Sequence, residues 1–294
     1  MGGRLLSGEV RKVVVVGGGI MGNGIAQVVA ASGLEVTIVD LDAAALERAR
    51  GRIERNLGRS VEAGRLERGE ADATLDRVAT STDLEAAAAD ADHAIETVVE
   101  DLAVKREVLA KLDAACREDV ILASNTSQFS ISALATATGR PDRVIGSHWF
   151  NPPPLMDLIE VIRGVETSDA TLAATLALAE RYGKRTVVCE KDTPGFITSR
   201  LIVTLGLEAM RIVEEGIASA EDVNLACVKA FNHAMGPLDT MDFSGLDTAL
   251  HVADNMREQY GERFIAPQNL RVLVNGGHLG RKTGRGFADY GKSS

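Results

Sequence analysis

The sequence has few cysteines, and their positions favour neither disulfides nor a metal site. Cys116, Cys189 and Cys227 are odd in number, widely separated and set in apolar or helical surroundings. A disulfide framework would need paired cysteines, and a C-x-x-C metal site would need two of them close together. We therefore expect reduced, structural thiols and no metal site.

Long hydrophobic runs are also missing. No stretch approaches the ~18 consecutive apolar residues of a membrane span, and the first residues, MGGRLLSGEVRK, lack the apolar core of a secretion signal. The opening MGG is similar to a myristoylation motif, but Leu6 stands where serine or threonine is expected. These absences predict a cytoplasmic protein that does not bind membranes.

Positive charge is in deficit, since 32 lysines and arginines face 42 aspartates and glutamates, for a net charge of −10. Such a chain repels polyanions, so we expect neither nucleic acid nor an anionic membrane as a partner. The hydrophobic share of 45% and the charged share of 25% are typical of globular proteins. The length of 294 residues suits one large domain and one smaller domain.

From residue 12 to about residue 190, short β-branched runs alternate with longer amphipathic stretches, which predicts βαβ units around a mostly parallel, doubly wound sheet. The near-continuous apolar runs indicate strands buried on both faces. The predicted strands are KVVVVG from Lys12, EVTIVD to Asp40, RVATST from Arg77, HAIET from His93, VILASN to Asn125, RVIGSHW to Trp149, LIEVI to Ile162 and RTVVCE to Glu190. Helices are predicted between them, over 22–32, 41–63, 102–116 and 168–183.

After residue 191 the β-branched runs disappear, and helical periodicity continues through about Arg257 with breaks at Gly216, Gly236 and Gly245. We therefore predict an α/β domain over 1–190 and an all-α domain over 191–294. The last stretch, NGGHLGRKTGRGFADY, is predicted to be an ordered terminal loop.

A glycine-rich turn follows the first predicted strand and opens a helix. Its sequence is Gly17-Gly18-Gly19-Ile20-Met21-Gly22, a G-x-G-x-x-G fingerprint. Gly17 permits a tight turn, Gly19 leaves room for a pyrophosphate, and Gly22 lets the helix press on the sheet. The helix N-terminus then offers free N–H groups and a positive dipole end. The turn predicts a Rossmann-type dinucleotide site that includes Ile20 and Met21.

Asp40 ends the second predicted strand and strengthens this interpretation. A carboxylate at that place can accept both ribose hydroxyls of NAD. No arginine stands beside Asp40 to bind a 2′-phosphate, which the carboxylate would repel. The cofactor predicted is therefore NAD and not NADP.

Six further segments follow one another along the chain. They are GGGIMGNGIA, ETVVEDLAVK, SNTSQFSIS, GSHWFNPPPLMDLIEVI, DTPGFITSR and MGPLDTMDFSGLDT. Together they resemble the successive motifs of the 3-hydroxyacyl-CoA dehydrogenase family, which includes bacterial 3-hydroxybutyryl-CoA dehydrogenases. The resemblance implies reversible, NAD-dependent oxidation of the 3-hydroxyl of an acyl-CoA, of short chain in the bacterial case, in fatty acid or butanoate-type metabolism. It also implies a homodimer formed by the helical domain.

The same resemblance assigns the site. It implies His148 as the catalytic histidine, Glu160 as its partner and Ser127 as the substrate-positioning serine. The cofactor contacts that it implies on the nicotinamide side are Glu100, Lys105, Asn125 and Asn151. Two positions depart from the family pattern: Ser199 replaces an asparagine in PGFITSR, and Trp149 replaces a phenylalanine after the histidine.

The chemistry of these residue types agrees with the assignment. Oxidising an alcohol requires a base, and imidazole, with an unperturbed pKa of ~6.5, can take and return a proton at neutral pH. His148 closes one strand and Glu160 lies on the next, so the carboxylate can contact the imidazole. Ser127 follows the strand that ends at Asn125. We expect all of them at the carboxyl ends of strands, where ligands of open α/β sheets bind.

Ordinary structural roles remain open for several residues. Glu160 alone could be a buried ion-pair acid, and Ser199 could bond only to nearby backbone. Lys105 could pair with Asp101 on an exposed helix face. Four histidines have no catalytic context and are expected to be structural or on the surface: His93, His233, His251 and His278.

The coenzyme A site is less well defined. The family's serine and lysine contacts align near Asn56 and Ala63, and neither matches. Four arginines in the same segment could bind the phosphates or could simply be solvated: Arg52, Arg55, Arg59 and Arg65. Two other functions remain open, a sugar-acid dehydrogenase on the same scaffold and a non-catalytic NAD-binding protein.

Overall fold

The computed structural model describes residues 10–291 and divides the chain into two compact units, the first ending at Thr193 and the second beginning at Pro194. The segment MGGRLLSGE, on which the expectations about secretion and myristoylation depend, lies outside the described residues. Within residues 10–291, no helix is both long enough and apolar enough to cross a membrane. The three cysteines are free and buried, as predicted.

The first unit is built around one eight-stranded sheet with the order β3-β2-β1-β4-β5-β6-β7-β8. Its strands are β1 (Lys12–Val16), β2 (Glu35–Val39), β3 (Val78–Ser81), β4 (His93–Glu96), β5 (Ile121–Ser124), β6 (Val144–Trp149), β7 (Leu158–Arg163) and β8 (Arg185–Cys189). All eight predicted strands are confirmed. Because β2 and β4 lie on either side of β1, the strand order reverses there, and this is where open α/β sheets bind ligands.

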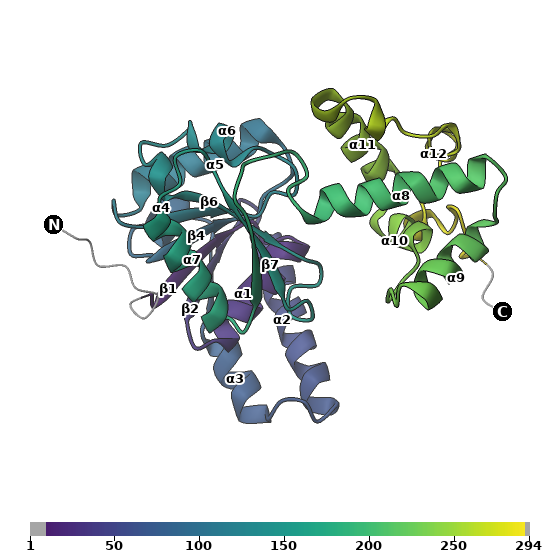
Figure 1. The fold of residues 1–294 in the computed structure, drawn as a ribbon. Helices are drawn as coiled ribbons and strands as arrows, with labels where there is room; N and C mark the ends of the chain where they lie inside the picture. Colours follow the sequence, from purple (N-terminus) through teal and green to yellow (C-terminus); the bar gives the residue numbers. More distant parts are fainter. Residues whose placement is uncertain (1–9, 292–294) are drawn as a thin grey trace. The chain divides into compact units, whose positions relative to one another are not determined.

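Helices cover both faces of this sheet (Figure 1). One face carries α1 (Ile20–Ala31), α2 (Ala43–Glu62) and α7 (Asp169–Arg181); the other carries α4 (Leu84–Ala88), α5 (Leu102–Ala115) and α6 (Ile131–Ala135). Alternation along β1 sends Val13 and Val15 into the core with Ile25 of α1 and Ile53 of α2. Burying a side chain such as Ile53 stabilises the fold by about 1.5–3 kcal/mol.

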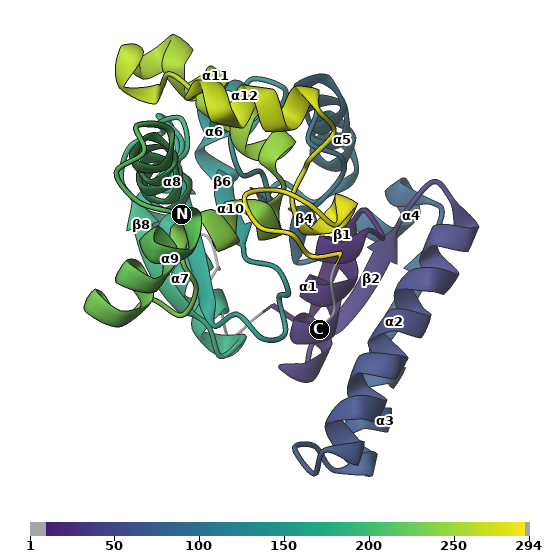
Figure 2. The same cartoon turned by 90° about the vertical axis from the view of Figure 1, so that its right-hand side faces the viewer.

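The long helix α2 is amphipathic and forms a hairpin with α3 (Arg68–Asp76), as Figure 2 shows. Asp42 caps its start by accepting a hydrogen bond from Ala44 N at 2.9 Å. Its buried positions recur at helical spacing, from Leu46 through Ile53 to Leu57, and pack on the sheet side. Of the arginines between them, Arg48 and Arg55 are exposed, whereas Arg50 donates to Val78 O on β3.

Two neighbouring strands, β7 and β8, run against the other six. The pair β6 and β7 is antiparallel, whereas the other neighbouring pairs are parallel. The connection, residues 150–157, is too short for the crossover of a dozen or more residues that a parallel pair needs. The expectation that Glu160 lies at the carboxyl end of its strand is therefore wrong. Glu160 lies near the start of β7, beside the end of β6.

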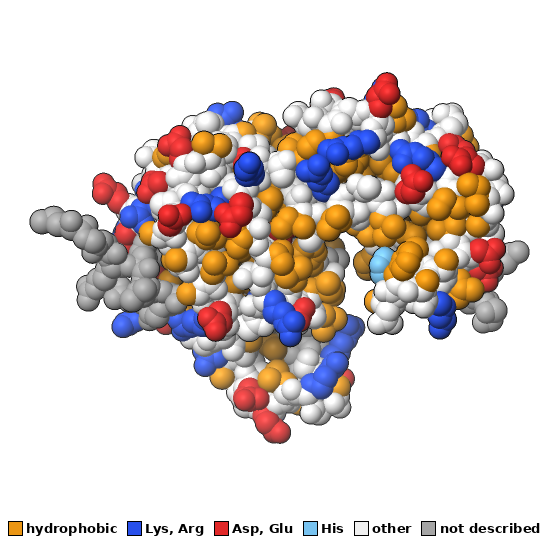
Figure 3. Space-filling view, in the orientation of Figure 1, with side chains coloured by type: hydrophobic (Ala, Val, Ile, Leu, Met, Phe, Trp, Pro, Cys, Tyr) orange, Lys and Arg blue, Asp and Glu red, His pale blue; other side chains and the backbone are white. Residues whose placement is uncertain are grey.

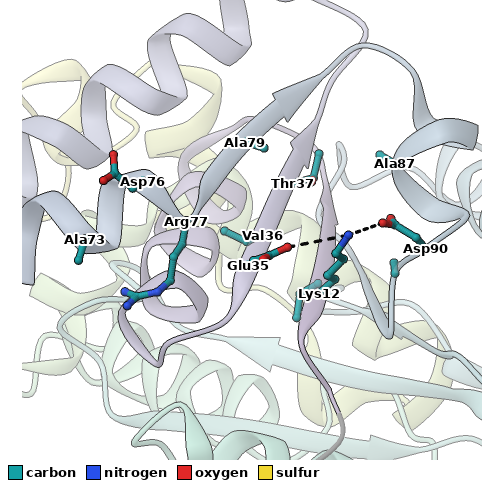
Figure 4. Close-up of a pocket in the computed structure, with 12 residues that line it drawn as sticks. Lys12, Glu35, Val36, Thr37, Ala73, Asp76, Arg77, Ala79, Ala87 and Asp90 are labelled. Atoms are coloured by element: carbon teal, nitrogen blue, oxygen red, sulfur yellow. Dashed lines mark hydrogen bonds and ion pairs between the residues drawn. The ribbon is translucent and has the colours of Figure 1, made fainter.

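A cavity of about 490 Å³ opens at the amino ends of β1, β2 and β3 (Figure 4). Three of its charged groups pair with one another, since the Lys12 amine lies 2.5 Å from Asp90 and 3.9 Å from Glu35. Ligands of open α/β sheets bind at the carboxyl ends of the strands. This cavity lies at the opposite edge and is not the predicted site.

The second unit is helical, as predicted. It contains α8 (Thr198–Glu214), α9 (Ala220–Ala230), α10 (Pro237–Ser244), α11 (Leu246–Tyr260) and α12 (Gln268–Asn275). Helix α12 lies beyond the point near Arg257 where the predicted helical region ended. A core that includes Leu207, Met210 and Leu246 joins the helices.

The C-terminal loop is ordered, as predicted, and a buried aspartate holds its last residues. The Asp242 carboxylate, on α10, accepts hydrogen bonds from Phe287 N, Ala288 N and the Tyr290 hydroxyl, each at 3.0 Å. Burial, together with this hydrogen bond to Asp242, raises the pKa of Tyr290 to about 12. Asp242 thus holds the end of the loop on α10, and Lys282 of the loop pairs with Asp247 of α11 at 2.6 Å.

Candidate active site

The glycine turn between β1 and α1 has a different physical reason for each glycine. Gly17 adopts φ 111°, and a Cβ there would lie 2.7 Å from Thr97 O. A Cβ on Gly22 would lie 1.8 Å from Gly17 O, so the helix can approach the strand only without a side chain. Gly19 is different, because a Cβ there would meet no protein atom within 4 Å. The space beside Gly19 is open, as a bound pyrophosphate would require.

The start of α1 also fits an anionic ligand. Gly19 is its N-cap and provides no side-chain hydrogen bond, and no acidic residue lies in the first turn. The first N–H groups of the helix are therefore not capped by a side chain, and they carry the positive end of the helix dipole. Ile20, in this turn, is 63% exposed, and Met21 beside it is half-buried.

Asp40 lies directly after β2 and is held by the glycine turn. Its Oδ2 accepts from Gly18 N at 2.8 Å, and its Oδ1 accepts from Asp42 N at 3.0 Å. Each oxygen keeps a further lone pair for a ligand. A carboxylate fixed in this way beside the turn can accept ribose hydroxyls, and it would repel a phosphate.

The predicted contact between His148 and Glu160 is present. The two residues face each other across the antiparallel ladder of β6 and β7, and His148 Nδ1 lies 2.9 Å from Glu160 Oε2. Glu160 is fully buried and His148 is 9% exposed. The Phe150 ring packs against the imidazole at 4.7 Å between centroids. A buried carboxylate at this distance fixes the ring and favours a proton on Nδ1.

Asn125 connects two neighbouring strand ends. It follows β5, and its side-chain oxygen accepts from Trp149 N at 2.8 Å, at the end of β6. This bond places the loop that carries Ser127 beside the strand that carries His148. Asn151, the other predicted amide, is exposed just beyond β6.

Glu100 and Lys105 occupy different environments. Lys105 is completely buried, and its amine lies 2.9 Å from Glu96 and 3.1 Å from Glu100. The alternative pairing of Lys105 with Asp101 on an exposed face is wrong, because the side chain points toward the sheet. Asp101 instead caps α5 by accepting from Ala103 N and Val104 N.

Ser127 is half-buried and contacts Glu100. Its backbone N–H donates to Glu100 Oε1 at 3.0 Å, and its hydroxyl lies 3.3 Å from the same oxygen. Sequence reasoning missed Thr126, whose hydroxyl donates to Glu100 at 2.6 Å, and also missed the buried Glu96. Glu96 ends a strand within the segment ETVVEDLAVK, so a carboxylate inside an apolar run was the available signal.

The remaining predicted residues lie on other helices and on the loop between α2 and α3. Ser199 is the second residue of α8, in the second unit, and is half-buried. Of the four arginines near the α2–α3 hairpin, Arg55, Arg59 and Arg65 are exposed and Arg52 is half-buried. Within residues 10–291, no group of three or more histidine, cysteine, aspartate or glutamate side chains could hold a metal ion.

The site therefore combines a doubly wound sheet, an open glycine turn with Asp40 beside it, and a buried histidine–glutamate pair. These features together are typical of a nucleotide-dependent oxidoreductase. Two family models then cover almost the whole chain: "3-hydroxyacyl-CoA dehydrogenase, NAD binding domain" matches residues 12–193, and "3-hydroxyacyl-CoA dehydrogenase, C-terminal domain" matches residues 195–290. The protein belongs to the 3-hydroxyacyl-CoA dehydrogenase family.

Individual relatives of the chain support this family assignment. The chain is 42% identical to a 3-hydroxybutyryl-CoA dehydrogenase of Mycobacterium tuberculosis, over 97% of this chain and 100% of the relative. It is 40% identical to the mitochondrial hydroxyacyl-coenzyme A dehydrogenase of Homo sapiens, over 96% of this chain and 91% of that one. The solved (S)-3-hydroxybutyryl-CoA dehydrogenase of Ralstonia eutropha superposes with a TM-score of 0.93 at 38% identity, covering 97% of this chain and 100% of that chain.

Proposed function

We propose that the protein interconverts a short-chain (S)-3-hydroxyacyl-CoA, 3-hydroxybutyryl-CoA in the first place, and its 3-oxo form with NAD. The observation that carries this proposal is the buried 2.9 Å contact between His148 and Glu160 at the ligand-binding edge of the sheet. The 3-hydroxybutyryl-CoA dehydrogenases that resemble the chain over its full length support the short acyl group.

His148 moves the proton of the reaction. With its Nδ1 proton donated to Glu160, the neutral imidazole carries its lone pair on Nε2, which takes the proton of the 3-hydroxyl. Glu160 then stabilises the imidazolium, because its carboxylate lies against the charge in a buried setting. Ser127 holds the 3-oxygen. NAD held at the glycine turn would supply the acceptor for the hydride of substrate C3.

The glycine turn, Asp40 and two asparagines bind the nucleotide. Gly19, Ile20 and Met21 surround the open space at the start of α1, with Gly17 and Gly22 shaping the turn.

Asp40 accepts the adenosine ribose hydroxyls and thereby selects NAD over NADP. Asn125 and Asn151 lie on the nicotinamide side, and the Asn125 amide nitrogen can donate there because its oxygen is already bonded to Trp149 N. Ser199 is proposed as a further substrate contact, as the family resemblance implies.

Two further properties belong to the same proposal. The exposed arginines of the α2–α3 hairpin attract the coenzyme A phosphates to an otherwise acidic protein. The second unit forms a homodimer, since it leaves large apolar side chains exposed, some of which Figure 3 shows in orange. These are Leu201, Ile217, Leu225, Phe231, Phe243 and Val272. The enzyme acts in the cytoplasm, without nucleic acid or membrane partners.

The test is a series of assays of NADH formation. Substrates are (S)-3-hydroxyacyl-CoA thioesters of four to sixteen carbons, with NAD and NADP compared, and free hydroxy acids in parallel. We expect the highest kcat/KM at the short end with NAD. Turnover of free hydroxy acids without CoA would instead indicate a sugar-acid type of dehydrogenase, and NAD binding without any turnover would indicate a non-catalytic protein.

The role of His148 has a direct test. We expect His148→Gln to lower kcat by ~10²–10⁴, because the reaction loses its proton acceptor. The control is His251→Gln, an exposed histidine of the second unit, which should keep kcat within twofold. A His148→Gln enzyme within threefold of wild type would remove His148 from the mechanism.

A further inference from the structure

Lys105 is enclosed by the protein and surrounded by oxygens of its own unit. Its side chain is completely buried, a costly place for an ammonium unless every N–H is satisfied. The amine donates to Glu96 Oε1 at 2.9 Å and to Val98 O at 3.4 Å, and it forms an ion pair with Glu100 Oε2 at 3.1 Å. Lys105 therefore acts on the site through these partners and not by touching a bound molecule.

Of the two carboxylates, only Glu100 reaches the site. Glu96 is fully buried and is used within the fold, accepting also from Val98 N at 2.7 Å and from the Ser124 hydroxyl at 2.5 Å. The Glu100 side chain is 31% exposed, and its second oxygen accepts from the loop after β5. Glu100 thus connects a fixed lysine on α5 to the loop that carries Ser127.

The lengths of the bonds to Glu100 Oε1 differ in an informative way. The Thr126 hydroxyl lies at 2.6 Å and the Ser127 N–H at 3.0 Å, both well-formed hydrogen bonds. The Ser127 hydroxyl lies at 3.3 Å, near the outer limit. The backbone at Ser127 is held firmly, whereas its hydroxyl can turn toward a substrate oxygen at little cost.

We propose that Glu100 is a positioning residue: anchored by Lys105, it fixes the backbone at Ser127 and so sets where the Ser127 hydroxyl meets the 3-oxygen of the substrate. This inference rests on the proposed function, in which Ser127 holds that oxygen. It gives Glu100 and Lys105 a role different from the direct cofactor contact that the resemblance implies.

The chemistry of the pair suggests a selective substitution. A carboxylate accepts on both oxygens, whereas a glutamine amide accepts on only one. In Glu100→Gln the side chain can satisfy either Lys105 or the loop, but not both. Adding Lys105→Met removes the competing donor, so the glutamine oxygen can turn to Thr126 and Ser127. The double variant also keeps the net charge of minus one that Glu96, Glu100 and Lys105 carry together.

The experiment compares three variants of the full chain with wild type: Glu100→Gln, Lys105→Met/Glu100→Gln and the control Glu107→Gln. Glu107 lies on the same helix and makes an exposed pair with Lys111. Measured are kcat and KM for 3-hydroxybutyryl-CoA, the Kd of NADH by fluorescence titration, and amide hydrogen exchange over 126–129.

We expect Glu100→Gln to lose about 10–100-fold in kcat/KM for the acyl-CoA, because small displacements of a substrate-positioning group are costly. Its NADH Kd should stay within threefold, and exchange at Ser127 N–H should accelerate at least tenfold. The double variant should recover part of the lost kcat/KM and slow the exchange again. The control should match wild type within twofold in every measurement.

Three results would overturn the proposal: NADH binding at least tenfold weaker in Glu100→Gln, unchanged kcat/KM, or a double variant less active than Glu100→Gln alone. If Glu100→Gln does not fold, Glu100→Asp replaces it, since this variant keeps the charge but is one methylene too short to reach both partners. If wild type oxidises no 3-hydroxyacyl-CoA, the proposed function fails, and hydrogen exchange at Ser127 alone decides whether Glu100 holds the loop.

Discussion

Two lysines of the first unit each lie between two carboxylates, at opposite edges of the same sheet. At the amino edge, Lys12 contacts Asp90 and Glu35, as Figure 4 shows, and its side chain is 47% exposed. At the other edge, Lys105 contacts Glu96 and Glu100, and its side chain is 1% exposed. The charges are alike, but the surroundings differ.

The comparison shows what burial does to a charged group. In water the Lys12 cluster is screened and each group can find another partner, so its geometry constrains little. The Lys105 cluster has lost its water, so each hydrogen bond becomes obligatory and fixes the segment that provides it. The buried Lys105 cluster lies where the protein holds the loop that carries Ser127. The exposed Lys12 cluster lies at the opposite edge of the sheet, which has no part in the proposed function.

The largest expected effect is on the buried lysine. Lys105→Met should lower the free energy of unfolding by about 3–5 kcal/mol, because two carboxylates lose their shared cation in a buried setting. Urea unfolding followed by circular dichroism measures the loss. Lys111→Met, on the same helix with an exposed partner 2.7 Å away, is the matched control and should unfold at the wild-type urea concentration. Equal stability of Lys105→Met and wild type would contradict the comparison.

A smaller effect is expected from a buried histidine. Burial lowers the pKa of His93, on β4, to about 4, so the folded protein keeps this imidazole neutral. As pH falls below about 6.5, the unfolded chain takes up a proton that the folded chain refuses. The free energy of unfolding should therefore fall between pH 6.5 and pH 4, by on the order of 3 kcal/mol from this group.

The contribution of His93 is isolated by difference. His93→Leu removes the titrating group and should show a shallower fall in stability across this pH range than wild type, in urea unfolding at half-unit pH steps. His251→Leu, at an exposed position, should keep the wild-type slope. Parallel curves for wild type and His93→Leu would show that burial does not perturb this histidine.

The same contrast explains what the sequence could predict. The strands were predictable because β-branched runs such as KVVVV and EVTIV are local signals, and Gly17 to Gly22 and Asp40 belong to one contiguous βαβ unit. The opposition of His148 and Glu160 was predicted because the two residues lie on successive strands. The antiparallel direction of β7 follows from the short connection between these strands, yet the strand-end argument placed Glu160 at the wrong end.

The sequence did not allow us to predict in the same way which charged side chains are buried. Spacing of four residues suggested that Lys105 pairs with Asp101, but which side of α5 faces the sheet depends on packing against β4 and β5. The partners of Lys105 come from the end of β4 and the segment after it, and the donors on Glu100 come from the loop after β5. Only the folded sheet brings these segments together, so the support behind Ser127 could not be inferred from motifs.

The smallest expected effect completes the comparison of the two lysines. Lys12→Met removes the cation that lies between Asp90 and Glu35, but all three side chains are largely in water. Their carboxylates regain hydration when the lysine is removed, so we expect a melting temperature within about 1 °C of wild type. Any residual difference should vanish in 0.5 M salt, because screening at that ionic strength acts over roughly 4 Å. A fall in melting temperature as large as that of Lys105→Met would mean that the number of ion pairs, and not their burial, determines how strongly a charged cluster holds the chain.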